Sequence, residues 1–497
     1  MTQPQSAVVI GAGFGGLAAA LRLAALGHRV RVIDPLPLAG GRARVIHRGS
    51  FRYDAGPTVI TAPSLLRELF ALFGERLQDH VELLPVKPWY RMQFADGTHL
   101  DYVAQADGLR EEIARLSPPD AARYPAFLEA TRRRYASGYT AWADQPFSSW
   151  GAMLRVLPDI LRLRAYRSVY AFVSDHFKDE RLRRAFSIQP LLIGGNPFNT
   201  PSLYALIHYL EQDEGIWFPR GGTGALVRAL VALGERHGVE FEAGARAVEI
   251  GLGDDGRACN VAAHDGRRWS ADLVVANADP GRVYASLLPP ARVGRWTPRR
   301  LQRVDYSMSL FVMYFSVTGR YDSVPHHTIL FGRQYRETLA GIFRGREVPQ
   351  DLSIYLHRPC ATDPDMAPPG HDSLYALVPV PNLRSGIDWA QEGERLCERL
   401  TDALQERLLS NLRERLVDRS FVTPNYFRDR LQTPAGAAFS MSPTLQQSAA
   451  LRFPGRSERV PNLFFVGAGV HPGAGVPGAL LSAKVAERFW LPRGATA

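Results

Sequence analysis

Glycines near the start of the chain have the spacing of a loop that holds a dinucleotide. Gly11, Gly13 and Gly16 occupy the three glycine positions of a GxGxxG pattern. In such a loop the first glycine permits a tight turn, the second lets the backbone approach a pyrophosphate, and the third lets a helix pack close to a strand. Asp34 follows at the distance where a carboxylate accepts hydrogen bonds from ribose hydroxyl groups, and an acid here disfavours the 2′-phosphate of NADP. The spacing therefore predicts a site for NAD or FAD.

The elements that must position this loop flank it on both sides. Residues 7–10 form a short apolar run that predicts a strand buried on both faces. Residues 17–27, rich in Ala and Leu, predict a helix, and residues 29–33 predict a second strand that ends at Asp34. The N-terminus of such a helix offers unpaired N–H groups and a partial positive charge to phosphates. Strand, loop, helix and strand in this order support a dinucleotide site.

A second glycine-rich loop lies close to the C-terminus. Residues 462–466 predict a strand, residues 467–479 read GAGVHPGAGVPGA, and residues 480–490 predict a helix. A loop that feeds a helix N-terminus supplies N–H donors and a positive dipole for negative charge, such as that around N1 and C2=O of a reduced flavin. His471 lies in this loop and has the chemistry of a base. A structural hydrogen-bonding role is the alternative, so His471 is only a candidate catalytic residue.

Two further motifs resemble those of a known family. Residues 38–44, LAGGRAR, resemble the GGR motif of the flavoprotein group that contains amine oxidases, carotenoid desaturases and Rab GDP-dissociation inhibitors; NAD dehydrogenases lack this element. Residues 53–59, YDAGPTV, form a turn where that group brings backbone beside the flavin ring. The pattern GAGxHPGAGxPG at 467–478 and the sequence GGNP at 194–197 narrow the resemblance to bacterial-type phytoene desaturases. The similarity extends over essentially the whole chain.

The resemblance implies FAD as the cofactor and no metal. The cofactor-binding residues that it implies are Gly11, Gly13, Gly15, Gly16, Asp34, Gly41, Arg42, Gly56, Pro57, Thr58, Val248, Gly467, Gly469, Gly475, Val476 and Pro477.

For function, the resemblance implies successive dehydrogenations of 15-cis-phytoene toward neurosporene or lycopene in carotenoid biosynthesis, with hydride transfer to flavin N5. Phytoene and partially desaturated carotenoids would be the ligands, and a quinone or oxygen would reoxidise the cofactor. Some family members carry an Arg-Asp pair ahead of a Met-Leu, where this chain has Gly151 and Ala152. The proton acceptor is therefore left unassigned, as are the number of desaturation steps, the product isomer and the oligomeric state.

Three alternatives keep the fold and change the function. A related carotenoid dehydrogenase would act on hydroxylated, methoxylated or C30 carotenoids. An amine oxidase would need a lysine near flavin N5, and Lys87, Lys178 and Lys484 lie in no matching motif. A prenyl-binding chaperone like the Rab GDP-dissociation inhibitors would not use flavin, and the intact glycines at both ends of the cofactor site argue against it.

The fold class expected is α/β: a Rossmann-like FAD-binding domain built from discontinuous segments, with an inserted mixed α+β substrate domain and a helical membrane-facing region. We expect the FAD-binding domain at 1–92, 213–289 and 426–497, and the substrate and membrane-associating domain at 93–212 and 290–425. Further expected elements are a helix at 225–236 and strands at 239–243, 246–250, 310–317 and within 272–279.

The charge balance is basic, with 59 Lys and Arg against 49 Asp and Glu and a formal net charge of +10. Nearly all of the cations are arginine, and no compact basic run indicates a nucleic-acid partner. Cys259, Cys360 and Cys397 form no CxxC pair, so neither a metal site nor a disulfide framework is indicated.

The expected location is the cytoplasmic side of a membrane, in peripheral association. The chain shows no signal peptide and no run of apolar residues long enough to span a bilayer. Residues 153–186 alternate apolar and arginine residues, as in a basic amphipathic helix that lies in a membrane interface. A helix that packs on its own core with a solvated arginine face is the alternative.

Overall fold

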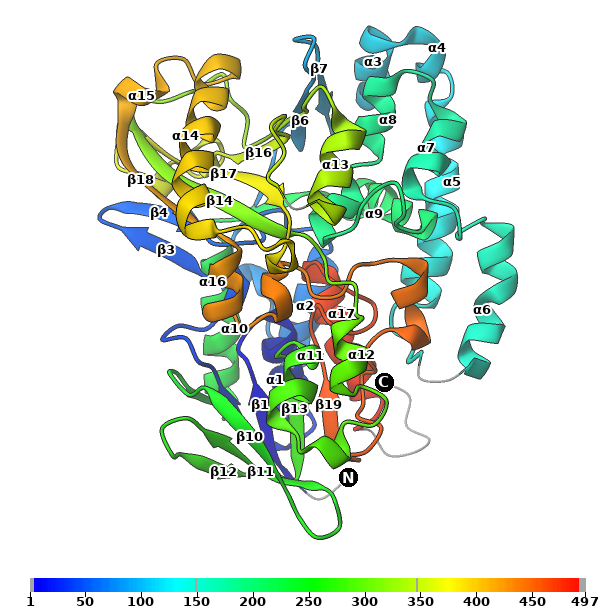
Figure 1. Cartoon of the computed structure of the whole chain (residues 1–497), viewed down its shortest axis with the longest axis vertical. Coiled ribbons are helices and arrows are strands. Elements are labelled where there is room, and N and C mark those ends of the chain that lie inside the picture. The colour runs from blue at the N-terminus through cyan, green and yellow to red at the C-terminus, as the bar shows by residue number, and fades with distance from the viewer. Residues whose placement is uncertain (1–3, 148–149, 346, 491–497) are drawn as a thin grey trace.

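A parallel sheet of five strands forms the base of the molecule (Figure 1). The computed structural model describes residues 4–147, 150–345 and 347–490. The sheet has the order β19-β13-β1-β2-β9. Its strands are β1 (Ser6–Ile10), β2 (Arg29–Ile33), β9 (Glu240–Glu242), β13 (Leu273–Ala276) and β19 (Leu463–Phe465). Neighbouring strands come from distant parts of the chain, so the sheet is assembled from discontinuous segments, as expected.

Alternate side chains of β1 enter two different cores. Ala7 and Val9 pack with the helices on one face, while Val8 and Ile10 enter the core on the other face. The first face is covered by α1 (Phe14–Ala25), α2 (Pro63–Ala71), α10 (Thr223–Arg236) and α17 (Val476–Glu487). The second face is covered by an antiparallel sheet of β10 (Ala247–Leu252), β11 (Ala258–Ala263) and β12 (Arg268–Ser270). A strand covered on both faces requires the continuous apolar run that the sequence has at this position.

A larger sheet of seven strands lies above the first in Figure 1, in the order β18-β14-β17-β16-β15-β6-β7. Its strands are β6 (Tyr90–Gln93), β7 (His99–Tyr102), β14 (Ser309–Thr318), β15 (His327–Leu330), β16 (Ile354–His357), β17 (His371–Val380) and β18 (Leu416–Val422). All neighbours are antiparallel except β15 and β6. Phe311 and Met313 of β14 share a core with α14 (Trp389–Arg407), whereas Leu310 and Val312 enter the core on the opposite face.

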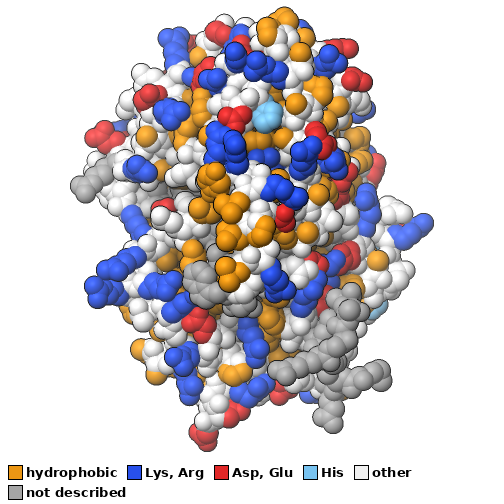
Figure 2. Space-filling view, turned by 90° about the vertical axis from the view of Figure 1, so that its right-hand side faces the viewer, with side chains coloured by type: hydrophobic (Ala, Val, Ile, Leu, Met, Phe, Trp, Pro, Cys, Tyr) orange, Lys and Arg blue, Asp and Glu red, His pale blue; other side chains and the backbone are white. Residues whose placement is uncertain are grey.

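Helices gather on the right-hand side of Figure 1, the side that faces the viewer in Figure 2. They are α3 (Ala106–Leu116), α4 (Pro118–Ala121), α5 (Tyr124–Tyr135), α6 (Trp150–Arg162), α7 (Val169–His176), α8 (Glu180–Phe186) and α9 (Leu206–Glu214). Among the residues that the structure describes, no helix combines the length and the apolar character needed to cross a bilayer.

The stretch 153–186, expected as one amphipathic helix, is divided among α6, α7 and α8. Arg164, just after α6, has a left-handed backbone with φ of 49°, which ends the helix. Ser168 then accepts a hydrogen bond from the Ala171 amide and caps α7. Asp179 caps α8 in the same way. Side chains that cap helices compete with helix continuation, and the amphipathic pattern alone did not reveal them.

The other elements are shorter or connect the two sheets. They are β3 (Val45–Arg48), β4 (Phe51–Asp54), β5 (Leu83–Pro85), β8 (Trp217–Pro219), α11 (Pro280–Arg282), α12 (Pro298–Gln302), α13 (Tyr335–Arg344), α15 (Leu412–Arg415) and α16 (Pro424–Asp429). The strands and helices expected around both glycine loops all form, with ends displaced by a few residues. Strand β6 spans the expected domain boundary between residues 92 and 93 and pairs with the larger sheet.

Candidate functional site

A cavity of about 510 Å³ extends from the carboxyl ends of the parallel strands to the face of the seven-stranded sheet. This edge of a parallel sheet is where ligands bind in α/β folds of this kind. The sequence-predicted residues that line the cavity are Gly11, Gly13, Gly15, Asp34, Gly41, Arg42, Gly56, Pro57, Thr58, Gly467, Gly469, Gly475, Val476 and Pro477. The structure therefore brings together segments that are more than 400 residues apart in the chain.

Two of the sequence-predicted cofactor-binding residues do not line the cavity. Gly16 lies inside α1, where an added Cβ would stand 1.9 Å from the Gly11 carbonyl oxygen, so its part is to let the helix pack against the loop. Val248 lies on β10 with 42% of its surface exposed, while its neighbour Ala247 lines the cavity.

Asp34 holds the first glycine loop in place. Its carboxylate oxygens accept hydrogen bonds from the amides of Ala12 at 2.7 Å and Leu36 at 2.8 Å. Burial raises the pKa of Asp34, and these two amides act in the opposite direction. Each carboxylate oxygen has a second lone pair, so Asp34 can still accept a ribose hydroxyl from the cavity.

Arg42 is a half-buried cation that lacks a full set of partners. Burial lowers the pKa of Arg42, while the neighbouring Asp279 and Tyr426 act to raise it. Its Nε atom is buried and has no hydrogen-bond partner among the described residues. A guanidinium with an unpaired buried donor is costly unless an acceptor is supplied by a bound molecule. Arg42 therefore marks the cavity as a site for a ligand with hydrogen-bond acceptors.

The loop at Gly56 and Thr58 is fixed from two directions. Asp54, just before it, accepts the amide of Thr223 at 2.7 Å and so caps the N-terminus of α10. Burial raises the pKa of Asp54 to about 7. On the other side, the Thr58 hydroxyl lies 2.8 Å from the Tyr355 hydroxyl and 3.0 Å from the Tyr375 hydroxyl. The loop thus joins the cofactor side of the cavity to the seven-stranded sheet.

The C-terminal glycine loop delivers the N-terminus of α17 to the cavity. Gly467, Gly473 and Gly475 have φ of 91°, 136° and 99°, a region that favours glycine. The amide of Gly467 donates to the Ser482 hydroxyl at 2.7 Å, which ties the loop to the helix that follows. Because α17 begins at Val476, its unpaired N–H groups and partial positive charge lie at the cavity wall.

His471 lies in this loop but is not among the residues that line the cavity. Its Nε2 atom is 3.2 Å from the Trp142 carbonyl oxygen, and the Phe147 ring meets it edge-on. Burial lowers the pKa of His471 to about 4. This placement favours the structural role over that of a base.

Three further histidines form a buried cluster that the sequence pattern did not indicate. Possible metal-ligating atoms of His326, His327 and His357 all lie within 4.8 Å of one another. The Nε2 atoms of His326 and His357 are 3.0 Å apart and share a hydrogen bond, and His327 bonds the Tyr355 hydroxyl at 2.7 Å. Burial lowers the pKa of His326 well below its ordinary value, and the positive charge of the buried Arg358 acts in the same direction and would oppose a cation. The cluster therefore fits a neutral hydrogen-bonded core better than a metal site.

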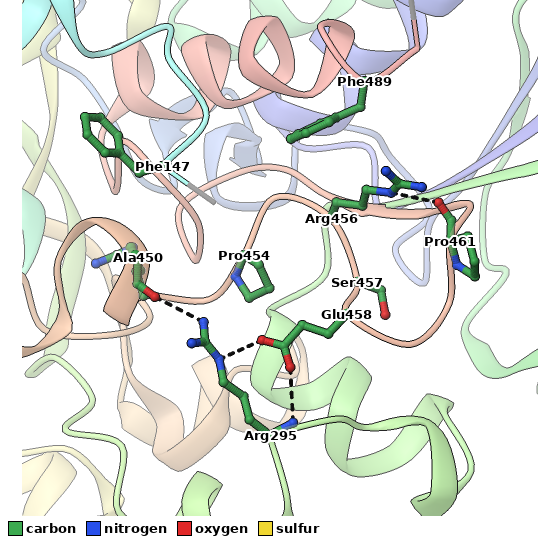
Figure 3. A pocket seen from close by; sticks show the side chains of 10 residues that line it. Phe147, Arg295, Ala450, Pro454, Arg456, Ser457, Glu458, Pro461 and Phe489 are labelled. Carbon is green, nitrogen blue, oxygen red and sulfur yellow. Dashed lines mark hydrogen bonds and ion pairs between the residues drawn. The ribbon is translucent and has the colours of Figure 1, made fainter. Parts of the chain in front are cut away.

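A second hollow, of about 430 Å³, is lined by none of the residues that line the first cavity (Figure 3). Arg295 pairs with Glu458 at 2.7 Å and donates to the Ala450 carbonyl, and Arg456 donates to the Pro461 carbonyl. None of the residues predicted from the sequence lines this hollow, and its charged side chains pair with each other or donate to backbone carbonyls. The first cavity is therefore the candidate site.

Comparison with known proteins agrees with this geometry. The family model described as flavin-containing amine oxidoreductase matches residues 14–486. The chain is 46% identical over 485 residues to a lycopene-forming phytoene desaturase of Pseudescherichia vulneris, which covers 97% of this chain and 98% of that protein. It is 41% identical over 490 residues to a neurosporene-forming phytoene desaturase of Rhodobacter capsulatus, which covers 97% of this chain and 93% of that protein. The chain belongs to the phytoene desaturase group of the flavin-containing amine oxidoreductase family.

The fold agrees with this family. A solved structure of an oxidoreductase from Methanosarcina mazei matches with a TM-score of 0.66 at 17% identity, and the match covers 96% of this chain and 98% of that one. At this identity the likeness shows a shared fold and no more.

The residues present in this flavin-containing oxidoreductase fit FAD. The glycine loop at Gly11 and Gly13 leaves backbone exposed to the cavity for a pyrophosphate, and Asp34 can take the ribose. Arg42 supplies an unpaired buried donor, and the N-terminus of α17 supplies a positive dipole for the negative charge of a reduced flavin.

Polar residues on the seven-stranded sheet and on α9 were missed by sequence reasoning. Tyr355, Tyr375 and Glu211 line the same cavity. A tyrosine or glutamate inside an apolar strand or helix is too common to indicate a site alone. Glu211 does follow His208 by three residues, a spacing that places both on one face of a helix.

Proposed function

We propose that this protein is an FAD-dependent phytoene desaturase that dehydrogenates 15-cis-phytoene stepwise toward neurosporene or lycopene. The observation that carries the proposal is one continuous cavity with two different halves. One half is lined by the glycine loops and Arg42, and the other is lined by aliphatic side chains. The aliphatic lining includes Leu206, Ile207, Leu210, Leu310, Val312, Ile329 and Leu377. A hydrocarbon has no polar groups to recognise, so it would bind through apolar burial and shape.

In this reaction bound FAD supplies an acceptor for two electrons and one hydrogen as hydride. The chain would hold the cofactor through the loops at Gly13 and Gly475 and through Arg42. The aliphatic half would orient one CH₂–CH₂ unit of the substrate and exclude water from the charge that develops there. Because that positive charge is allylic and delocalised, the protein needs no strong nucleophile.

A division of the chain into two units would suit this function. We propose a cofactor unit built around the five-stranded sheet and a substrate unit built around the seven-stranded sheet and the helices of 93–212. The pairing of β6 with β7 and β15 favours a first boundary ahead of Tyr90 rather than at residue 92.

We also propose that α6 meets a membrane surface, from which phytoene would enter. Leu154, Leu157 and Leu161 of α6 and the nearby Tyr166 are large hydrophobic side chains with 66%, 43%, 57% and 52% of their surface exposed. Figure 2 shows hydrophobic side chains gathered at mid-height on this face, with Lys and Arg side chains beside them. Apolar residues flanked by cations are typical of helices that lie in the headgroup region of anionic bilayers.

Replacing Leu157 and Leu161 together by glutamine should weaken binding to anionic vesicles by more than about 10-fold, since each fully buried leucine contributes roughly 1.5–3 kcal/mol. Vesicle co-sedimentation measures the effect. The matched control is Val417→Gln, because Val417 is 50% exposed on β18, away from α6. Equal losses in both variants, or none in either, would show that α6 is not the contact.

Expression in a host that accumulates phytoene but cannot desaturate it tests the function. We expect coloured carotenoids in the extract, and their spectra give the number of double bonds added. The Gly13→Val variant, which should hold no FAD, is the negative control. Unchanged phytoene beside folded, FAD-loaded protein would contradict the proposal and favour a C30 or an oxygenated carotenoid as the substrate.

A further inference from the structure

Four carboxylic acids line the cavity among the residues that the structure describes: Asp34, Asp54, Glu211 and Asp279. Three of them hold backbone amides. Asp34 accepts from Ala12 and Leu36, Asp54 accepts from Thr223, and Asp279 accepts from Gly281 at 2.8 Å. These contacts give the three acids a structural role, because each one fixes a loop or the end of a helix. Glu211 has no contact of this kind.

Glu211 is held only by neutral side chains. Its two oxygens accept the hydroxyls of Tyr90 at 3.1 Å and Tyr102 at 3.2 Å. Only 1% of its surface is exposed, and no ion pair involves it among the described residues. A carboxyl group buried without a cation or a backbone partner destabilises a fold, so a functional reason for it is expected.

The groups that face Glu211 come from every element around it. Tyr90 and Tyr102 lie on β6 and β7, and Gln189 reaches the carboxyl from the segment Gln189–Ile193. On its own helix, His208 bonds the Tyr102 hydroxyl, and through its Nε2 it meets Tyr124 of α5 at 3.3 Å. The one buried cation of α5 among the described residues, Arg134, is occupied by the carbonyls of Ser202, Ala130 and Leu163.

Glu211 is connected to the loop on which the cofactor would rest. Tyr90, which bonds Glu211, packs with its ring centroid 5.6 Å from that of His327. The Tyr355 hydroxyl bonds both His327 at 2.7 Å and Thr58 at 2.8 Å. Glu211 and Thr58 both line the cavity, and they are linked through Tyr90 and His327, which do not line it, and through Tyr355, which does.

We propose that Glu211 is the proton acceptor of the dehydrogenation, an inference that rests on the proposed function. Each step removes two hydrogens and two electrons from a CH₂–CH₂ unit. One hydrogen leaves as hydride with both electrons of its C–H bond, to the flavin. The adjacent C–H bond then breaks, its electron pair completes the new C=C bond, and the proton forms an O–H bond with the Glu211 carboxylate. Charge is conserved because the hydride leaves a cation that the proton loss neutralises.

The environment of Glu211 suits this role at neutral pH. Burial raises the pKa of Glu211 to about 7, while the hydrogen bonds from Tyr90, Tyr102 and Gln189 act to lower it. A base with a pKa near the working pH can take up a proton and release it again between steps. Only the ionised form can accept, so the desaturation rate should rise with pH through about 7.

Glu211→Gln keeps the hydrogen-bonding shape and removes the proton acceptor. We expect the single-turnover desaturation rate of the FAD-loaded protein to fall by about 100-fold or more, and its rise with pH to disappear. FAD content should be unchanged. Tyr124→Phe is the control, since it removes a hydroxyl from the same buried cluster without touching Glu211 and should keep both the rate and the pH dependence.

The role of burial at Glu211 can also be measured through protein stability, without an activity assay. The folded-state pKa of Glu211, about 7, exceeds its ordinary value of 4.5. The contribution of this group to stability is therefore fully present below pH 4.5 and is lost as pH rises to about 7. The unfolding temperature of Glu211→Gln should rise relative to wild type across this window, in protein without FAD.

The outcomes separate the two proposals. Wild-type protein that holds FAD but leaves phytoene unchanged contradicts the proposed function, whatever the variant does. Wild-type activity with an equally active Glu211→Gln, or with a rate independent of pH, overturns the role of Glu211. If Glu211→Gln does not fold, Glu211→Asp keeps a carboxyl that can accept a proton, so its rate should still rise with pH. A flat profile in that variant overturns the inference.

Discussion

Replacing Gly13 by valine should give a folded protein that holds no FAD. Gly13 has φ of −77° and ψ of 175°, a backbone that any residue adopts. An added Cβ would meet only Asn277 Nδ2 at 3.0 Å and the Gly40 carbonyl oxygen at 3.9 Å within 4 Å. The valine methyl groups would therefore occupy the cavity, at the place where the backbone must approach the pyrophosphate. We expect FAD affinity to fall by about 100-fold or more, which corresponds to roughly 2.7 kcal/mol.

The flavin-to-protein ratio of purified protein measures this effect. Because bound cofactor stabilises a protein by mass action, the unfolding temperature is compared between apoproteins. Gly341→Ala is the control, since its added Cβ would meet only Pro349 at 3.5 Å, in ordinary contact. Full FAD occupancy in Gly13→Val would mean that the pyrophosphate does not lie at this loop.

Gly16→Ala should have a different effect from Gly13→Val: it should lower the stability of the folded protein and not only its affinity for FAD. An added Cβ at Gly16 would stand 1.9 Å from the Gly11 carbonyl oxygen and 3.1 Å from its carbonyl carbon. These are backbone atoms that cannot turn aside, so α1 would have to move away from β1. We expect destabilisation by about 3 kcal/mol or more, the upper range for overpacking in a core.

Chemical denaturation of the apoprotein measures the loss, and added FAD should not restore the wild-type yield. The contrast with Gly13→Val separates the two roles that one glycine motif combines. If Gly16→Ala were as stable as wild type and merely lacked FAD, the third glycine would serve the cofactor and not the packing of the helix.

Elements close to the glycine loops could be predicted from the sequence because local rules determine them. The apolar run at 7–10 forms β1 and is buried on both faces, and Asp34 directly follows β2. In contrast, the division of 153–186 into three helices depends on Ser168 and Asp179. These side chains act as caps only where the chain can leave the helix, and that depends on the packing around them.

The candidate site was predictable mainly in its glycine loops and in Asp34 and Arg42, which lie in recognisable local motifs. Glycines are informative in a sequence because few other residues let the backbone approach a ligand closely or adopt a positive φ. Thr58, Tyr355 and Glu211 line one cavity from three separate segments, and no local pattern indicates that they share it. The pairing of β6 with β15, across more than 230 residues, is what brings Tyr90 between them.

The arrangement of the five-stranded sheet has a consequence for synthesis of the chain. Strand β19 and helix α17 lie within residues 463–487, yet α17 packs directly on α1, more than 450 residues earlier in the chain. Until residues 463–487 have been synthesised, α1 lacks one of the helices that pack on it and β13 lacks its outer neighbour β19. A nascent chain must therefore keep these surfaces from aggregating, and the cofactor pocket is complete only once β19 and α17 have been made. Loss of even the last two turns of α17 would therefore remove part of the cover of α1.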